Sequence, residues 1–195
     1  MKSLALVGAG GHAREVMAQM DKNLVCFVDD EFSDTNAKPL SEFDPNKYKL
    51  LIAVGDSKLR MDMYAKLPKS TEFFSFIHPT ANLMSDTVQI GNGTFIGAQS
   101  ILTCDIVVGN HVLLNRCNQI SHDNTLEDFV SLMPNVSLSG NVHLKKGVFL
   151  GANSSVKENV KITEKTLIGM HSLVTKSLDE PGVYFGVPVK KQNLV

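Results

Sequence analysis

The sequence lacks both a long apolar run and an excess of charge of either sign. No stretch approaches the roughly 18–20 apolar residues of a membrane span, so none is expected. Lys and Arg number 19 and Asp and Glu 20, and the net charge of −1 gives no electrostatic basis for binding nucleic acid or an anionic membrane. The start MKSLALVGAGGHAREV has a short apolar run, but glycines and then His12, Arg14 and Glu15 interrupt it, so we expect no export segment.

Cysteine is also scarce. The three cysteines, Cys26, Cys104 and Cys117, are odd in number and show no paired spacing. This usage fits a reducing cytoplasm and favours packed small side chains over reactive thiols. The length of 195 residues allows one large domain or two small ones.

The dominant feature that is present is a six-residue repeat of aliphatic residues. From Met84 to Val174, 16 positions spaced six apart all hold Ile, Leu, Val or Met, and the position four after each is mostly small or β-branched. This period is neither that of a helix nor that of a simple alternating strand, and it indicates a parallel β-helix. Three hexads make one triangular coil, so residues 84–174 predict about five coils. Ordinary hairpins would not keep this spacing without drift.

Glycine often follows the aliphatic residue of a hexad. We expect a turn with positive φ at these positions, because glycine adopts that conformation without steric cost. They are Gly91, Gly97, Gly109, Gly151 and Gly169.

The segment before the repeat, residues 1–76, shows no hexad and alternates between strand and helix patterns. LALVGAGGHAREVMAQM predicts a strand, a glycine turn and an amphipathic helix, and NLVCFVDD predicts a second strand. A third strand is expected at Leu50–Val54, with another helix after it. The pattern predicts a small α/β domain, a half-Rossmann-like unit of about three parallel strands, at residues 1–76. A β-helix domain with a C-terminal tail is expected at residues 77–195.

The glycine turn has the spacing of a nucleotide-binding motif. Gly8, Gly10 and Ala13 form a G-x-G-x-x-A run, and Asp29 stands at the end of the next strand, close to the usual spacing of about 20 positions. In the dinucleotide fingerprint, backbone N–H groups face a phosphate and the acid binds ribose hydroxyls. The alternative is a purely structural tight turn. A half-fold suits a mononucleotide better than NAD, so we expect a nucleotide-linked substrate. The residues expected to bind it are Gly8, Gly10, Gly11, His12, Asp29 and Asp30.

One histidine has the surroundings of a general base. In QISHDN, His122 is two residues after the inward Ile120, at or near a coil corner, and Asp123 follows it. The vertical neighbours, one coil before and one coil after, are Cys104 and Gly140, and the glycine would leave room beside the ring for a thioester. Imidazole accepts protons near neutral pH, and Asp123 or a backbone carbonyl can fix its tautomer. The alternative is a histidine exposed at the corner with no role in chemistry.

The other histidines form no catalytic pattern. His78, His111, His143 and His171 have no acid beside them in sequence and are expected to be structural, whereas His12 can reach a ligand at the glycine turn. Their spacings form no cluster of three metal ligands. A metal hydrolyase on the same fold is therefore disfavoured, and no metal is expected.

The order of the motifs resembles that of a known family. VGAGGHAREV, FVDD, IAVGD, FIHPTA, the hexads, SHDN, GNV, FLGANSSV and GVPVKK follow one another over essentially the whole chain. This order resembles the sugar acyltransferases of the hexapeptide-repeat superfamily, including the sialic acid O-acetyltransferases and, more closely, the bacterial nucleotide-4-amino-sugar N-acetyltransferases. The resemblance implies a left-handed β-helix, a homotrimer with sites between neighbouring subunits, and acetyl-CoA as the co-substrate.

The resemblance also implies a role for particular residues. His122, followed by Asp123, would be the general base in direct transfer of an acetyl group to the 4-amino group of a nucleotide-linked amino-deoxysugar, and a backbone N–H would stabilise the oxyanion. By motif position, the residues expected to contact CoA are Gly140, Ala152 and Met170, with Lys190 and Lys191 near its phosphates. One departure is Ser131, where many relatives carry a second histidine.

Two other functions stay open at this stage. The first is O-acetylation of sialic acid or a related sugar. The second is a non-catalytic β-helix spacer with a nucleotide sensor, which would have no use for a His–Asp pair. The sequence does not specify the nucleotide base, the sugar or the acyl chain.

Overall fold

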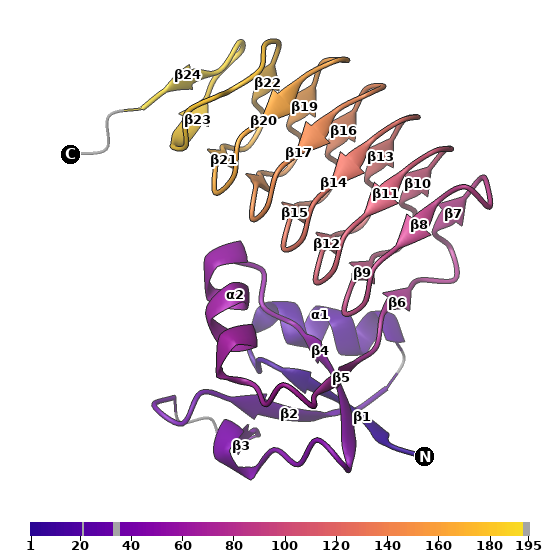
Figure 1. Cartoon of the computed structure of the whole chain (residues 1–195), viewed down its shortest axis with the longest axis vertical. Coiled ribbons are helices and arrows are strands. Elements are labelled where there is room, and N and C mark those ends of the chain that lie inside the picture. The colour runs from indigo at the N-terminus through magenta and orange to yellow at the C-terminus, as the bar shows by residue number, and fades with distance from the viewer. Residues whose placement is uncertain (21, 33–35, 193–195) are drawn as a thin grey trace.

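The computed structural model describes residues 1–20, 22–32 and 36–192. Figure 1 shows an α/β domain, in indigo and purple, beneath a stack of coils that runs from magenta to yellow towards the C-terminus. Within the described residues, no helix is long and apolar enough to cross a membrane.

The α/β domain is built on a five-stranded parallel sheet of order β3-β2-β1-β4-β5. Its elements are β1 (Ser3–Val7), α1 (Gly11–Met20), β2 (Val25–Val28), β3 (Lys38–Pro39), the 3₁₀ helix η1 (Leu40–Glu42), β4 (Tyr48–Ile52), α2 (Ser57–Lys66) and β5 (Glu72–Phe73). The strand order reverses between β1 and β4, and this switch point is where α/β sheets bind ligands.

The sequence predicted three of these five strands. Their order and the two helices are as expected, although the third strand begins and ends two residues earlier than Leu50–Val54. The prediction missed β3 and β5 because each has only two residues and neither contains an apolar run.

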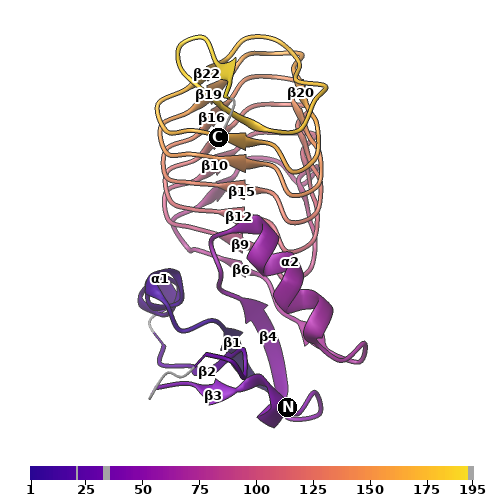
Figure 2. The same cartoon turned by 90° about the vertical axis from the view of Figure 1, so that its left-hand side faces the viewer.

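The two faces of this sheet pack against different partners, because alternate side chains of a strand point to opposite faces. Ala5 and Val7 of β1 pack on one face in a cluster that includes Met63 of α2. Leu6 packs on the other face with Val16 of α1, and Phe95 and Leu113 of the β-helix belong to the same cluster. Figure 2 shows α1 and α2 on opposite sides of the sheet, below the coils. One shared apolar cluster therefore joins the α/β domain to the first coils.

The β-helix has three faces, each a sheet of very short strands. Face I consists of β6 (Phe76–Ile77), β9 (Phe95–Ile96), β12 (Leu113–Leu114), β15 (Ser131–Leu132), β18 (Phe149–Leu150), β21 (Leu167–Ile168), β23 (Val183–Phe185) and β24 (Lys190–Lys191). Face II consists of β7 (Asn82–Leu83), β10 (Ile101–Leu102), β13 (Gln119–Ile120), β16 (Ser137–Leu138), β19 (Ser155–Val156) and β22 (Leu173–Val174). Face III consists of β8 (Gln89–Ile90), β11 (Val107–Val108), β14 (Thr125–Leu126), β17 (His143–Leu144) and β20 (Lys161–Ile162).

The hexad pattern builds the core as predicted. Ile120, for example, pairs with Leu102 below it and with Leu138 above it, in steps of one coil. The small residues four positions later are also buried, including Asn118 and Asn124. Their amides are paired with backbone, since Asn118 Oδ1 accepts from Val136 N at 2.9 Å. These contacts leave the buried polar groups of the two asparagines satisfied.

The predicted phase was wrong at its first position. Met84 is 62% exposed, and Leu83 points inward instead. Leu83 pairs with Leu102 on the next coil, and Ile90 pairs with Val108. The two partners of the first pair are therefore one residue farther apart in the sequence than the two partners of the second. One extra residue in the turn between β7 and β8 therefore shifts the start of the first coil out of phase with the others.

The expected role of the hexad glycines was also wrong. Positive φ falls three residues after the aliphatic position, usually on a residue other than glycine, as at His111 (54°) and Asp123 (61°). The glycines directly after the aliphatic position are required for a different reason. A Cβ on Gly91 would lie 2.5 Å from the carbonyl carbon of Gly109, so stacked coils approach too closely there for a side chain.

Candidate functional site

A cavity of about 560 Å³ lies at the switch point of the sheet. We call it the glycine pocket. It is lined by Gly8, Gly10, Gly11, His12 and Asp29, together with Val54 and Gly55 after β4 and the apolar side chains of Phe32, Leu59 and Met63. The structure thus brings together five of the six residues that the sequence assigned to substrate binding.

The glycines have different tasks in this pocket. Gly8 has φ of +113°, and a Cβ there would lie 2.9 Å from the carbonyl oxygen of Ala53, so Gly8 allows β1 and the end of β4 to approach each other. A Cβ built on Gly10 would meet no heavy atom of the described residues within 4 Å. Helix α1 begins at Gly11, so the free N–H groups of its first turn border an open space suited to an anion.

Asp29 and Asp30 are oriented differently. The Asp29 carboxylate lines the glycine pocket and forms an ion pair with Lys66, at the end of α2. The hydrogen bond from Lys66 lowers the pKa of Asp29, so this carboxylate is ionised at neutral pH. Asp30 lies in a neighbouring hollow, where its Oδ1 accepts a hydrogen bond from Ser41 N at 2.9 Å. Asp30 thus supports the loop and is not in the pocket lining.

His12 forms part of the wall of the glycine pocket. Its ring lies edge-on to Phe95, with ring centroids 5.8 Å apart, and its Nδ1 is 3.6 Å from the Glu15 carboxylate. Burial lowers the pKa of His12 despite the nearby Glu15, which favours a neutral ring at neutral pH.

His122 lies at the corner between faces II and III, where the sequence placed it. Its Nδ1 is 2.7 Å from Oδ2 of Asp123, and both side chains are more than half exposed. The ring lies against Gly140 of the next coil, since a Cβ there would be 2.7 Å from Nε2. The backbone is fixed as well, because Asn141 N donates to the His122 carbonyl at 2.9 Å. Asp123 thus orients the imidazole, and Gly140 provides the space that the ring occupies.

The predicted CoA contacts do not lie together in one chain. Gly140 shares the corner between faces II and III with His122, whereas Ala152 and Met170 lie at the corner between faces I and II. Met170 is 70% exposed. Lys190 is exposed on β24, and Lys191 beside it forms an ion pair with Glu180 at 2.7 Å.

Ser131 is part of the contact between the domains. It is fully buried on β15, and its Oγ accepts a hydrogen bond from Arg60 at 2.8 Å and donates to the carbonyl of Gly55 at 3.1 Å. Arg60 is also buried, and it donates to the carbonyls of Val54, Gly55, His111, Phe129 and Val130. Burial lowers the pKa of Arg60 to about 10, which leaves it charged at neutral pH. No sequence motif pointed to this contact, because its partners on the β-helix lie far from Arg60 along the chain.

Three of the other histidines have side-chain partners of their own. No acid adjoins His143 in sequence, but in the structure its Nε2 lies 2.7 Å from Oε1 of Glu127 on the coil below. His78 Nδ1 contacts Thr80 Oγ1 at 2.9 Å, and His171 contacts Asn153 at 3.3 Å. Among the described residues, no three His, Cys, Asp or Glu side chains are grouped closely enough to hold a metal ion.

Comparison with known proteins supports the same architecture. A variant of perosamine N-acetyltransferase from Caulobacter crescentus, solved with CoA and GDP-perosamine, is 24% identical and superposes with a TM-score of 0.85 over 99% of this chain and 98% of that one. This likeness shows the fold, and with it the predicted left-handed β-helix behind an α/β domain is confirmed.

Two curated relatives match parts of the chain. UDP-N-acetylbacillosamine N-acetyltransferase of Bacillus subtilis is 31% identical over 114 residues, which are 50% of this chain and 52% of the relative. A probable UDP-3-O-acylglucosamine N-acyltransferase of Arabidopsis thaliana is 29% identical over 105 residues, which are 52% of this chain and 34% of the relative. The chain thus spans about a third to a half of the length of these relatives.

The β-helix and these matches make the chain similar to the hexapeptide-repeat acyltransferases. Residues 3–67 match the model of the PglD N-terminal domain. This model covers about a third of the chain, and it shows that the α/β domain is similar to the N-terminal domain of PglD.

Proposed function

We propose that this protein transfers the acetyl group of acetyl-CoA to the 4-amino group of a nucleotide-linked amino-deoxysugar, with His122 as the general base. The observation that carries the proposal is the His122–Asp123 pair against Gly140, in a chain that also has a glycine pocket at a sheet switch point. The CoA and GDP-perosamine bound to the Caulobacter relative support both substrate classes. The odd number of cysteines without paired spacing fits a reducing cytoplasm, and we propose that the reaction takes place there.

The glycine pocket would hold the nucleotide. The first turn of α1, at Gly11 and His12, offers backbone N–H groups to a phosphate. The ionised carboxylate of Asp29 would accept hydrogen bonds from ribose hydroxyls. Phe32 and Leu59 are exposed apolar side chains on the pocket wall, and they would cover the base.

The geometry at His122 supports direct transfer. With the Nδ1 proton donated to Asp123, the lone pair of Nε2 is free to accept a proton. The neutral sugar amine attacks the acetyl carbonyl, a C–N bond forms, and Nε2 takes the proton that the nitrogen loses. A backbone N–H stabilises the oxyanion, the C–S bond then breaks, and the thiolate of CoA receives the proton from the imidazolium.

We also propose that the active site forms between two copies in a homotrimer. The glycine pocket adjoins face I of its own chain, whereas His122 and Gly140 lie at the corner between faces II and III. Ala152 and Met170 occupy a third position, at the corner between faces I and II. A neighbouring copy that places its II/III corner beside this pocket would unite the sugar, the base and CoA.

Subunit mixing tests this arrangement. Asp29→Ala and His122→Ala chains, each weak alone, are unfolded together and refolded as mixed oligomers. If each site takes its pocket from one chain and its base from another, about a quarter of the sites in the mixed oligomers carry neither substitution. Activity at limiting nucleotide sugar would then return in proportion to these intact sites. Recovery of no activity would contradict a shared site. Sedimentation should give three times the 21.3 kDa of one chain, and a stable monomer at micromolar concentration would contradict the trimer.

The substrate class is tested by acetyl-CoA consumption with a panel of acceptors. UDP-, GDP- and dTDP-linked 4-amino-deoxysugars are compared with the same sugars carrying a 4-hydroxyl group and with free sialic acid. Turnover confined to the amino-sugars supports the proposal. Turnover of free sialic acid alone would favour O-acetylation and contradict it.

A further inference from the structure

Arg60 carries a buried charge that no carboxylate neutralises within the described part of the chain. The residue is 2% exposed, and it is still charged at neutral pH because burial lowers its pKa only to about 10. Its nitrogens form no ion pair there and donate to backbone carbonyls and to the Ser131 hydroxyl. The Asp56 carboxylate caps α2, where its Oδ1 accepts from Leu59 N at 2.7 Å. Buried arginines are nearly always paired with an acid, so an unpaired one calls for an explanation.

This charge lies directly behind the wall of the glycine pocket. Nη1 of Arg60 donates to the carbonyl of Val54 at 2.7 Å and to that of Gly55 at 3.2 Å, and both of these residues line the pocket. Ser131 Oγ donates to the same Gly55 carbonyl at 3.1 Å. Arg60 itself is not in the lining, so the Val54–Gly55 backbone separates its guanidinium from a molecule in the pocket.

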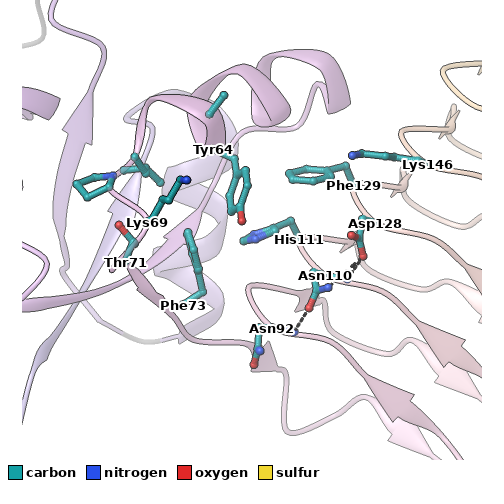
Figure 3. A pocket seen from close by; sticks show the side chains of 13 residues that line it. Tyr64, Lys69, Thr71, Phe73, Asn92, Asn110, His111, Asp128, Phe129 and Lys146 are labelled. Atoms are coloured by element: carbon teal, nitrogen blue, oxygen red, sulfur yellow. Dashed lines mark hydrogen bonds between the residues drawn. The ribbon is translucent and has the colours of Figure 1, made fainter.

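The remaining hydrogen bonds of Arg60 hold residues whose rings pack together where the domains meet. Its Nε donates to the carbonyl of His111 at 2.9 Å, and its Nη2 donates to that of Phe129 at 2.8 Å. The two rings stack with centroids 5.0 Å apart, and the Tyr64 ring lies 4.7 Å from that of His111. Figure 3 shows Tyr64 facing both rings from the α/β domain. In this dry setting the charge of Arg60 is screened far less than that of an exposed side chain.

The charge of Arg60 affects a histidine on each side of it. Burial is the main cause of the lowered pKa of His12, on the wall of the glycine pocket, and the charge of Arg60 acts in the same direction. On the other side, burial lowers the pKa of His111 to about 4, again with a contribution from Arg60. The two imidazoles are therefore neutral at neutral pH, and neither adds a positive charge to the pocket.

The lining of the glycine pocket carries the wrong charge for a phosphate. Among its described residues it contains two carboxylates, Asp29 and Glu31, and neither lysine nor arginine. Asp29 pairs with Lys66, whereas Glu31 is exposed and forms no ion pair with a described residue. The first turn of α1 supplies only about half a positive charge. A nucleoside diphosphate in this pocket therefore needs a cation that lies outside the lining.

Two exposed cations near the pocket are less suited to this task. Lys66 is already paired with Asp29. Nη2 of Arg14 would lie 3.9 Å from a Cβ on Gly11, but Arg14 is exposed and lines a different hollow, together with Lys22. Water and salt screen exposed charges of this kind, whereas they leave the field of a buried charge largely intact.

We propose that Arg60 is a positioning residue that makes the glycine pocket select the diphosphate of its ligand. Arg60 does not touch the ligand. Its charge attracts the diphosphate through the Val54–Gly55 backbone, and its hydrogen bonds hold that part of the pocket wall in place. This inference rests on the proposed function, since it takes the glycine pocket as the nucleotide site. It adds that a side chain outside the pocket selects the charged part of the nucleotide.

Two substitutions in the full chain separate charge from structure. Arg60→Lys and Arg60→Met both lose the forked hydrogen bonds, but only lysine keeps a positive charge, and a pH of about 6.5 favours its charged form. UDP, GDP and dTDP are titrated by calorimetry, and the matching nucleoside is measured by displacement. We expect Arg60→Met to bind the diphosphate at least about tenfold more weakly than Arg60→Lys, with nucleoside affinities that agree within about threefold. A purely structural role gives equal diphosphate affinities, and that result would overturn the proposal.

A second measurement keeps the test valid if the Arg60 variants fail to fold. In the wild type, attraction by a buried charge should let the diphosphate affinity fall by less than about threefold between about 0.05 and 0.5 M NaCl. A larger fall, or a loss of about tenfold in the exposed-arginine control Arg14→Met, would assign the attraction to surface cations and overturn the proposal. If none of the three diphosphates binds the wild type, the glycine pocket is not the nucleotide site, and the proposed function fails together with this inference.

Discussion

The imidazole Nδ1 of His122 and the carboxylate Oδ2 of Asp123 are 2.7 Å apart at an exposed corner of the β-helix. The backbone of Asp123 has φ of 61°, in the left-handed region. Asparagine tolerates the same conformation, so this contact can be altered without changing the turn.

Asp123→Asn should lower kcat and leave the fold intact. The amide no longer fixes the tautomer or stabilises the imidazolium, so we expect a loss smaller than the roughly 10²–10⁴-fold loss expected when the base itself is removed. The control is Asp105→Asn, at the same corner one coil earlier and also with positive φ, of 54°. Steady-state kinetics of both variants should show a large loss for the first alone. Equal rates would mean that Asp123 does not act through His122.

Asp29→Ala should raise the KM for the nucleotide sugar and leave the KM for acetyl-CoA nearly unchanged. The carboxylate lines the glycine pocket, and none of the predicted CoA contacts is in that lining. Loss of one charged hydrogen-bond partner corresponds to about a tenfold change or more in binding. Asp30→Ala provides the matched control, because that side chain bonds to Ser41 outside the pocket lining. Equal effects on both substrates would show that this pocket is not the nucleotide site.

Arg60→Met should destabilise the chain by about 3 kcal/mol or more, because several buried carbonyls lose their donor at once. The sulfur-containing side chain fills similar space, so the loss reports the hydrogen bonds more than a cavity. Arg14→Met, at an exposed position on α1, should change stability by less than about 0.5 kcal/mol. Urea denaturation followed by circular dichroism gives both values, and similar midpoints for the two variants would contradict this role.

The β-helix could be predicted from the sequence because each coil repeats the same local solution. Ile120 and Leu126 mark the inward positions whatever lies outside the helix, so the hexad period alone predicts a parallel β-helix, and its left hand was predicted from the resemblance. The phase error at Met84 arose because one inserted residue does not change the composition of the coil. The pair of His122 and Asp123 was predictable for the same reason, since neighbours in sequence and neighbours one coil apart are both set by the repeat.

Features that depend on contact between the two domains could not be predicted. Arg60 lies in an exposed-looking helix sequence, and only docking of that helix against face I buries it. In the sequence, Ser131 was notable only because many relatives carry a histidine at that position. In the structure, its hydroxyl forms hydrogen bonds with Arg60 and Gly55 across the junction. The contact between the rings of Tyr64 and His111, with centroids 4.7 Å apart, likewise joins residues that come from different domains and belong to no shared motif.

The central claim is that His122 is the general base, and the kcat of His122→Ala tests it most directly. The side chain is 61% exposed and is not part of the aliphatic core, so the thermal midpoint should stay close to that of the wild type. His143→Ala, one face away and paired with Glu127, is the control and should retain most activity. We expect kcat of the folded His122→Ala protein to fall by roughly 10²–10⁴. A folded variant that turns over within about threefold of the wild type would contradict the account, since loss of a positioned base costs far more than that.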